Sequence, residues 1–225
     1  LPDDAQKMFI ALGTFAGRGG IVPAALALGA AVGLTEDKAR IALERLGRAE
    51  LLTFNQQSEQ DAGASIDMHP LVQSFSRRLL AAWSEQEQET IRRYHAAFYA
   101  GWTQQISQEH IQTDDDFMGA SVSMIILRHE AENIDTALAW ADSHTPASNE
   151  ILAGITYGLR RYWWVQGRIA DNEHWLMRGY ATMQTLDPAW SRKLGSIAYM
   201  LGDTCRRYGD MEGALSLIHI SEPTR

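Results

Sequence analysis

The chain has 225 residues, of which 45% are hydrophobic and 21% charged, and its formal net charge is −8. This length is enough for one large or two ordinary domains. The acidic balance argues against a general nucleic-acid binder, which normally presents a basic face. No apolar stretch reaches the roughly 18 residues of a membrane span. The single cysteine, Cys205, excludes an internal disulfide and is compatible with a reducing cytosol, so we expect a cytoplasmic location.

Both ends of the chain look unnatural. The first residue is Leu1 rather than Met, so we interpret the chain as a fragment of a longer protein. Residues 215–225 match the translation of a transposase adaptor that is used in DNA sequencing libraries. We therefore expect the natural sequence to end near Ala214, and the tail is left out of functional reasoning.

Three helices are predicted before residue 50. The first begins at Pro2, where acidic residues favour a helix start, and it is broken by the glycines of 17–20, which we interpret as a plain interhelical loop. A second short helix is predicted over 23–31. Thr35 has the character of an N-cap for a third helix, over 36–48.

A β-hairpin is predicted next. Residues 51–54 and 65–68 have the apolar character of two short strands, and a polar loop joins them. Pro70 then opens a fourth helix, which runs to about Ala82. Three helices followed by a hairpin are typical of a winged-helix domain, which we assign to residues 1–82.

Residues 83–146 are assigned to a helical linker. A helix begins in the polar stretch from Ser84, and the aspartates of 114–116 precede another helix, as expected for carboxylates at a positive helix end. From 147 to 214 the helices come in pairs, with breaks at Gly167 and at Gly209. A weak repeat of about forty residues indicates an α-solenoid of the tetratricopeptide type. The expected fold class is therefore mainly α.

Sites for chemistry are few. No phosphate-binding loop of the form GxxxxGK[ST] is present, and His129-Glu130 fails the HExxH zinc pattern at its second histidine. We predict no catalytic residue and no metal site. Cys205 lies in an amphipathic helix and is predicted to be a core residue. The third helix and the turn after it, 36–50, contain four basic and four acidic residues. No basic face is evident, so direct DNA binding is not expected.

An aromatic concentration lies in the predicted repeats, at Tyr162, Trp163, Trp164 and Trp175. Such residues either fill the core between paired helices or contact a ligand or partner. Both interpretations stay open. His69, at the junction of strand and helix, is on spacing alone a helix cap or packing residue.

The segment Met68-His69-Pro70-Leu71-Val72, with Phe75 and Arg77 after it, resembles the MHD motif of the STAND class of signalling ATPases, NB-ARC branch, in its common bacterial form. The opening residues 1–6 and the segment 42–52 resemble the winged helix of that family.

Later segments resemble the same family in the same order. Residues 130–141 look like its linker helix, and 163–168 with 175–176 resemble the opening of a tetratricopeptide-like sensor array. Residues 201–203 and 208–214 look like tetratricopeptide consensus positions.

In that family the MHD histidine contacts the phosphates of bound ADP and holds the inactive state. The resemblance assigns this role to His69, whereas Pro70 replaces the family's aspartate, so any contribution of that aspartate is absent. It implies that ADP or ATP with Mg²⁺ binds an upstream nucleotide-binding domain, the partner in cis, and that the fragment itself needs no cofactor. It also implies that the helical repeats sense a protein or small-molecule inducer, and that this chain is not the enzyme.

Two other functions stay open. One is a winged-helix DNA-binding transcription regulator with a helical effector domain, which a basic face on residues 36–50 would favour. The other is a plain tetratricopeptide scaffold that binds peptides in a groove.

Overall fold

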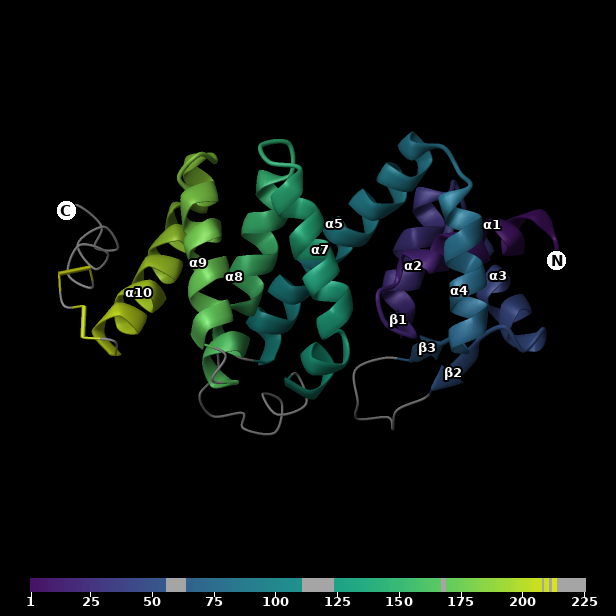
Figure 1. Ribbon diagram of the computed structural model, residues 1–225, viewed down its shortest axis with the longest axis horizontal. Helices are drawn as coiled ribbons and strands as arrows, with labels where there is room; N and C mark the ends of the chain where they lie inside the picture. The colour runs from purple at the N-terminus through teal and green to yellow at the C-terminus, as the bar shows by residue number, and fades with distance from the viewer. Residues whose placement is uncertain (56–63, 111–123, 167–168, 208, 211, 214–225) are drawn as a thin grey trace. The chain divides into compact units, whose positions relative to one another are not determined.

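The computed structural model describes the chain except for residues 56–63, 111–123, 167–168, 208, 211 and 214–225 (Figure 1). The described part is mainly helical and has one small antiparallel sheet, which confirms the predicted mainly helical class. Contacts divide the chain into two compact units. The first consists of Leu1–Tyr99 and Ser121–Trp140, and the second of Ala100–Ala120 and Ala141–Arg225. The predicted linker, 83–146, is thus divided between the two units. No helix in the described ranges combines the length and the apolar character that crossing a membrane requires.

The elements of the first unit follow the predicted order, with additions. Its helices are α1 (Asp3–Ala11), the short 3₁₀ turn η1 (Leu12–Thr14), α2 (Val22–Ala31), α3 (Glu36–Arg48), α4 (Pro70–Ala81), the first part of α5 (Glu85–His110) and most of α7 (Ala131–Ser143). Its strands are β1 (Gly19–Ile21), β2 (Thr53–Asn55) and β3 (Ser65–Asp67).

The sheet has the order β1-β3-β2, with both pairs antiparallel. The β2–β3 pair is the predicted hairpin, and most of the loop that joins its strands lies outside the described residues. Strand β1 corrects the interpretation of residues 17–20 as a plain loop. Gly20 lies opposite Ile66 in the ladder, and a Cβ atom on Gly19 would overlap the carbonyl group of Ile66. The glycine-rich sequence is therefore needed for a close approach of two strands.

Local sequence explains the position of α3. The Oγ1 atom of Thr35 accepts a hydrogen bond from the backbone N–H of Lys38, as predicted for an N-cap. Acidic residues occupy the first turn and basic residues the last, which suits the helix dipole. One face is buried, and against it α2 approaches closely, because a Cβ on Gly29 would lie 2.7 Å from the Cβ of Ala39.

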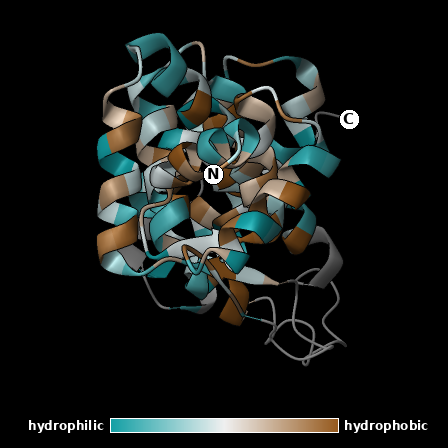
Figure 2. Cartoon of the chain, turned by 90° about the vertical axis from the view of Figure 1, so that its right-hand side faces the viewer, coloured by the Kyte–Doolittle hydropathy of each residue, from teal (hydrophilic) through white to brown (hydrophobic). Residues whose placement is uncertain are grey.

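The core of the first unit lies between its helices and the sheet. Figure 2 shows apolar and polar residues alternating along most helices, the pattern of amphipathic elements that each bury one face. Burial of each large apolar side chain contributes about 1.5–3 kcal/mol. The largest fully buried side chains here are Met8, Leu12, Phe15, Leu28, Leu46, Ile66, Met68, Ile91, Tyr99, Leu127 and Leu138.

The second unit is built from helices alone within its described residues. These are the rest of α5, the end of α7, α8 (Asn149–Val165), α9 (Ile169–Met183), the short turn η2 (Pro188–Trp190) and α10 (Ser191–Arg207). The predicted helices over 151–166, 169–186 and 189–208 are confirmed in place, while the break at Gly167 lies outside the described residues.

Glycines set the distances between helices of this unit. A Cβ on Gly158 of α8 would lie 2.5 Å from Oγ1 of Thr103 on α5, and one on Gly154 would lie 3.2 Å from the Cβ of Ala100. Gly179 of α9 packs in the same way on Thr156 of α8. Helix α8 therefore approaches α5 on one side and α9 on another more closely than larger residues would allow.

Candidate functional site

His69 stands at the start of α4, immediately after β3. Its backbone is extended, and its Nδ1 atom accepts a hydrogen bond from the N–H of Leu71 at 3.3 Å. Pro70, at the first helical position, donates no N–H and suits this place. The helix cap expected from spacing is thus present. Because Nδ1 accepts, the ring proton is on Nε2, which is therefore a hydrogen-bond donor.

The segment before His69 is fixed on both sides. The N–H of Met68 donates to the carbonyl oxygen of Arg18 at 2.7 Å, and the amide Nδ2 of Asn55 donates to Oδ2 of Asp67 at 2.7 Å. Met68 is buried, whereas His69 is exposed. The imidazole is consequently held by a rigid strand end and points away from the core.

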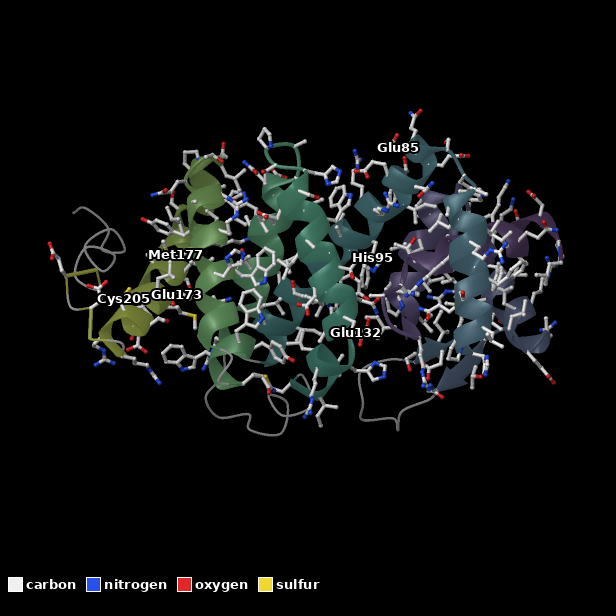
Figure 3. All side chains as sticks on the ribbon, in the orientation of Figure 1. Glu85, His95, Glu132, Glu173, Met177 and Cys205 are labelled. Atoms are coloured by element: carbon white, nitrogen blue, oxygen red, sulfur yellow. The ribbon has the colours of Figure 1, made fainter. Side chains whose placement is uncertain are left out.

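A polar cavity of about 540 Å³ lies beside the start of α4. Pro70 contributes to its wall, and its charged or titratable side chains are Arg18, Asp67, His129 and Glu132. Figure 3 labels Glu132 on α7, on the side toward β1, and its Oε2 atom would lie 2.9 Å from a Cβ on Gly17. Both signs of charge occur here, so the cavity is not a purely cationic phosphate site.

Asn133 forms the floor of this cavity and is 3% exposed. Its Oδ1 atom accepts from the N–H of Ala16 at 2.8 Å, and its Nδ2 atom donates to the carbonyl oxygen of Gly19 at 2.9 Å. Nδ2 also donates to Oε2 of Glu130 at 3.1 Å. One side chain therefore fixes α7 to the loop before β1.

Glu130 is a buried carboxylate, 1% exposed. The hydroxyl of Tyr99 donates to its Oε2 atom at 2.5 Å, and Nδ1 of His129 lies 3.3 Å from Oε1. These bonds compensate for the loss of water around the charge. Burial, and then the charge of Glu130, raise the pKa of Tyr99 well above its ordinary value.

His95 lies next to this network and is 2% exposed (Figure 3). Its ring centroid is 4.9 Å from that of Tyr99 and 6.0 Å from that of Phe15. Its Nε2 atom has no hydrogen-bond partner among the described residues. Burial lowers the pKa of His95 to about 4, against a smaller opposing effect of the Asn133 amide. The ring is therefore neutral at pH 7.

Helix α4 binds the same loop from the other side. The Nε2 atom of Gln73 donates to the carbonyl oxygen of Phe15 at 3.2 Å, and Nη2 of Arg77 donates to that oxygen at 2.7 Å and also to the carbonyl of Ala16. Helix α4, whose N-cap is His69, thus binds the same loop, at Phe15 and Ala16, that Asn133 binds. The sequence offered Arg77 and residues 130–141 only as family features, and their partners, far away in the chain, were missed.

The aromatic residues singled out in the sequence lie in the second unit. Tyr162 and Trp163 are buried, at 4% and 2% exposure, so packing is the role that their positions give them. Trp164 is half-buried, with the guanidinium carbon of Arg207 3.8 Å from its ring centroid, and Trp175 is half-buried beside His174. A ligand contact stays a prediction for these last two residues.

Cys205 and the metal prediction can be placed as well. Cys205 is half-buried on α10, rather than fully buried in the core as predicted, and burial raises the pKa of its thiol, which makes it a poor nucleophile. Within the described ranges, no group of three metal-ligating side chains comes together.

Comparison with known proteins adds no relative to these observations. The sequence matches no protein-family model, and no curated protein matches it.

Proposed function

We propose that the chain is the regulatory and sensor part of a nucleotide-switched signalling ATPase of the STAND class. In this proposal the first unit is a winged helix that stabilises the inactive, ADP-bound state, and the second unit begins a tetratricopeptide-like array that senses a ligand or partner. Hydrolysis belongs to a separate nucleotide-binding domain, because the sequence has no phosphate-binding loop. The observation that carries the proposal is the hydrogen bonding of His69.

The imidazole of His69 is prepared to donate to an anion. Its Nδ1 atom is occupied by the N–H of Leu71, so the exposed Nε2–H is the free donor. It stands at the N-terminus of α4, where the helix dipole favours negative charge. A phosphate of ADP, held by another domain, is the group that this arrangement suits best in the STAND context.

The rest of α4 supplies a path for the switch. Gln73 and Arg77 bind the carbonyl groups of Phe15 and Ala16, and Asn133 binds the N–H of Ala16. A displacement of α4 that follows the loss of a phosphate contact would therefore break or shift its bonds to the loop at Phe15 and Ala16, which Asn133 of α7 also binds. In this way the bound nucleotide, ADP or ATP, would shift the equilibrium between two packing arrangements of the first unit.

The charges of α3 support this proposal over DNA binding. Nη2 of Arg40 lies 2.6 Å from Oε1 of Glu36, and Nη2 of Arg48 lies 3.3 Å from Oε2 of Glu44. Two arginines on the helix that would enter a DNA groove are thus paired within the helix itself. Phosphate contacts would have to break these pairs and face their carboxylates.

The test uses a protein in which this chain is joined to a nucleotide-binding domain. Because a hydrogen bond to a charged group contributes about 1.5–3 kcal/mol, we expect His69→Ala to speed ADP release by about 10- to 100-fold and to raise basal activity. The measurement is release of a fluorescent ADP analogue in stopped flow.

Two variants separate phosphate binding from helix capping. His69→Asn retains a cap, since asparagine is a preferred N-cap residue, but its amide is too short to replace Nε2, so it should release ADP as fast as His69→Ala. Arg78→Ala, which removes an exposed charge from the same helix, should release ADP like the wild type. An unchanged ADP release rate in both His69 variants would refute the proposal.

A further inference from the structure

Arg160 of α8 is a buried cation that has no anionic partner among the residues that the structure describes. It is 6% exposed, and its guanidinium donates to three neutral groups. Nε donates to Oγ of Ser196 at 3.0 Å, and Nη1 donates to Oγ of Ser107 at 3.2 Å and to the carbonyl oxygen of Tyr157 at 2.6 Å. No carboxylate in the described part of the chain pairs with it. Buried arginines are normally paired, because an uncompensated charge is costly away from water.

Lys193 of α10 is a second cation near Tyr157, and it is half-buried. Its Nζ atom donates to Oε1 of Gln104 at 2.6 Å and lies 4.1 Å from the ring centroid of Trp190. Burial lowers the pKa of Lys193. Its hydrogen-bond partner is again neutral, and no carboxylate of the described residues forms an ion pair with it.

The two cations share one aromatic ring. The guanidinium carbon of Arg160 lies 3.9 Å from the centroid of Tyr157, and Nζ of Lys193 lies 5.4 Å from it. Helices α5, α8 and α10 all contribute to this cluster, which comprises Gln104, Ser107, Tyr157, Arg160, Lys193 and Ser196. Ser107 is fully buried, whereas Tyr157, Lys193 and Ser196 are half-buried, so part of the cluster is accessible to solvent.

We propose that this cluster is a binding site for a compact oxyanion, the carboxylate or phosphate group of a small ligand. The six residues of the cluster provide two cations, three hydroxyls and an amide, and no negative charge. Nη2 of Arg160 makes no hydrogen bond with a described residue, although the other two nitrogens of the guanidinium do. Burial lowers the pKa of Arg160, Tyr157 raises it by a smaller amount, and the like charge of Arg161 lowers it by the least.

An oxyanion would complete the chemistry of the cluster. Its oxygens could accept from Nη2 of Arg160 and from Nζ of Lys193, and each bond would be charge-assisted. The aromatic rings of Tyr157 and Trp190 keep both cations in place before the ligand arrives. Binding of an oxyanion would therefore cost little side-chain entropy, and its negative charge would compensate for the positive charges of Arg160 and Lys193.

The experiment measures thermal unfolding of the 225-residue chain at pH 7 in sodium phosphate, sodium acetate or sodium chloride of equal ionic strength. We expect phosphate, acetate or both to raise Tm by about 3 °C over chloride at ten times the dissociation constant. Phosphate alone would identify a phosphate ligand, and both together a carboxylate or phosphate. Equal Tm values in all three salts would overturn the proposal.

Matched variants locate the effect. Lys193→Met keeps the aliphatic stem and should abolish the rise, while Lys38→Met, on α3 of the first unit, should keep it. Arg160→Met should also abolish it, because it removes the guanidinium that would donate to the anion. If Lys193→Met responds to phosphate as strongly as Lys38→Met does, the site is refuted.

The idea that this anion is the signal read by the second unit rests on the proposed function, but binding itself does not. His69→Ala serves to separate the two. It should leave the phosphate-induced rise in Tm unchanged, because His69 is not part of the cluster. A rise that His69→Ala removes and Lys193→Met retains would assign phosphate to His69 and overturn the site on α8 and α10.

Discussion

Asn133 uses both donors and the acceptor of its amide to join segments that lie more than one hundred residues apart in the chain. Its partners are backbone groups of Ala16 and Gly19 and the carboxylate of Glu130. Removing the amide leaves several of them buried without a partner, and each such group costs about 1–3 kcal/mol.

We therefore expect Asn133→Ala to lower the free energy of unfolding by about 3 kcal/mol, measured by urea denaturation. Thr136→Ala serves as the control, because Thr136 is exposed on the same helix and bonds only to its own helix backbone. It should change stability by less than about 0.5 kcal/mol. Equal effects of the two substitutions would show that the amide does not join these segments.

His95 gives the first unit a dependence on acid. Its pKa is about 4 in the folded chain, below the ordinary value of 6.5, so between these two values the unfolded chain binds a proton that the folded chain does not. Its contribution is fully present above pH 6.5 and is lost as the pH falls to 4. The loss amounts to at most about 3 kcal/mol.

The measurement is urea denaturation at several pH values between 7 and 4.5. His95→Phe should flatten the decline relative to the wild type, because a neutral ring replaces the imidazole between Phe15 and Tyr99. His174→Gln, at an exposed histidine of α9, should decline as the wild type does. Parallel curves for wild type and His95→Phe would contradict the prediction.

At the scale of elements, β1 depends on one glycine. A methyl group on Gly19 would overlap the carbonyl of Ile66, which is backbone and cannot move aside without breaking the pairing of β1 with β3. Gly19→Ala should cost about 3 kcal/mol or more. Gly101→Ala on α5 should instead stabilise by about 0.5–1 kcal/mol, because nothing lies within 4 Å and alanine favours the helix.

Thermal or urea unfolding of both variants checks that Gly19→Ala lowers the stability and that Gly101→Ala raises it. A mild effect at Gly19, similar to that at Gly101, would mean that β1 separates from β3 without cost to the unit.

The elements that the sequence predicted are those whose cause is local. Thr35 caps α3, Pro70 opens α4, and an alternating apolar pattern marks β3, so each is visible within a few residues. Strand β1 was missed because its only local signal is a pair of glycines. The strand forms by pairing with β3 at Ile66, which is far along the chain.

In the candidate site, too, the sequence predicted only the features that have a local cause. His69 could be found from its neighbours and its resemblance to a family motif, and its cap geometry was expected. The network of Tyr99, Glu130 and Asn133 could not be found, because a carboxylate or amide on a helix looks the same in sequence whether it faces water or a distant backbone. The same holds for Arg160, whose neutral partners come from two other helices.

For the whole molecule, the proposed function predicts weak nucleotide affinity. His69 provides one phosphate hydrogen bond, worth about 1.5–3 kcal/mol, which alone corresponds to a dissociation constant well above 1 mM. Isothermal titration of the 225-residue chain with ADP should show no binding tighter than about 1 mM, although phosphate at the Arg160 cluster contributes weakly. Micromolar binding that Lys193→Met leaves intact would place a complete nucleotide site in this chain.

The three bonds of Asn133 also decide how the chain can be cut. Residues 1–82, the predicted winged-helix domain, contain Ala16 and Gly19 but not the side chain that satisfies them, and they lack His95, Tyr99 and Leu138 as well. The first structural unit is therefore made of two separate segments of the sequence. A gene fusion or recombination that exchanges this unit intact between proteins has to transfer α7 and the start of α5 with it, because a crossover between β3 and α7 separates Asn133 from its backbone partners at Ala16 and Gly19.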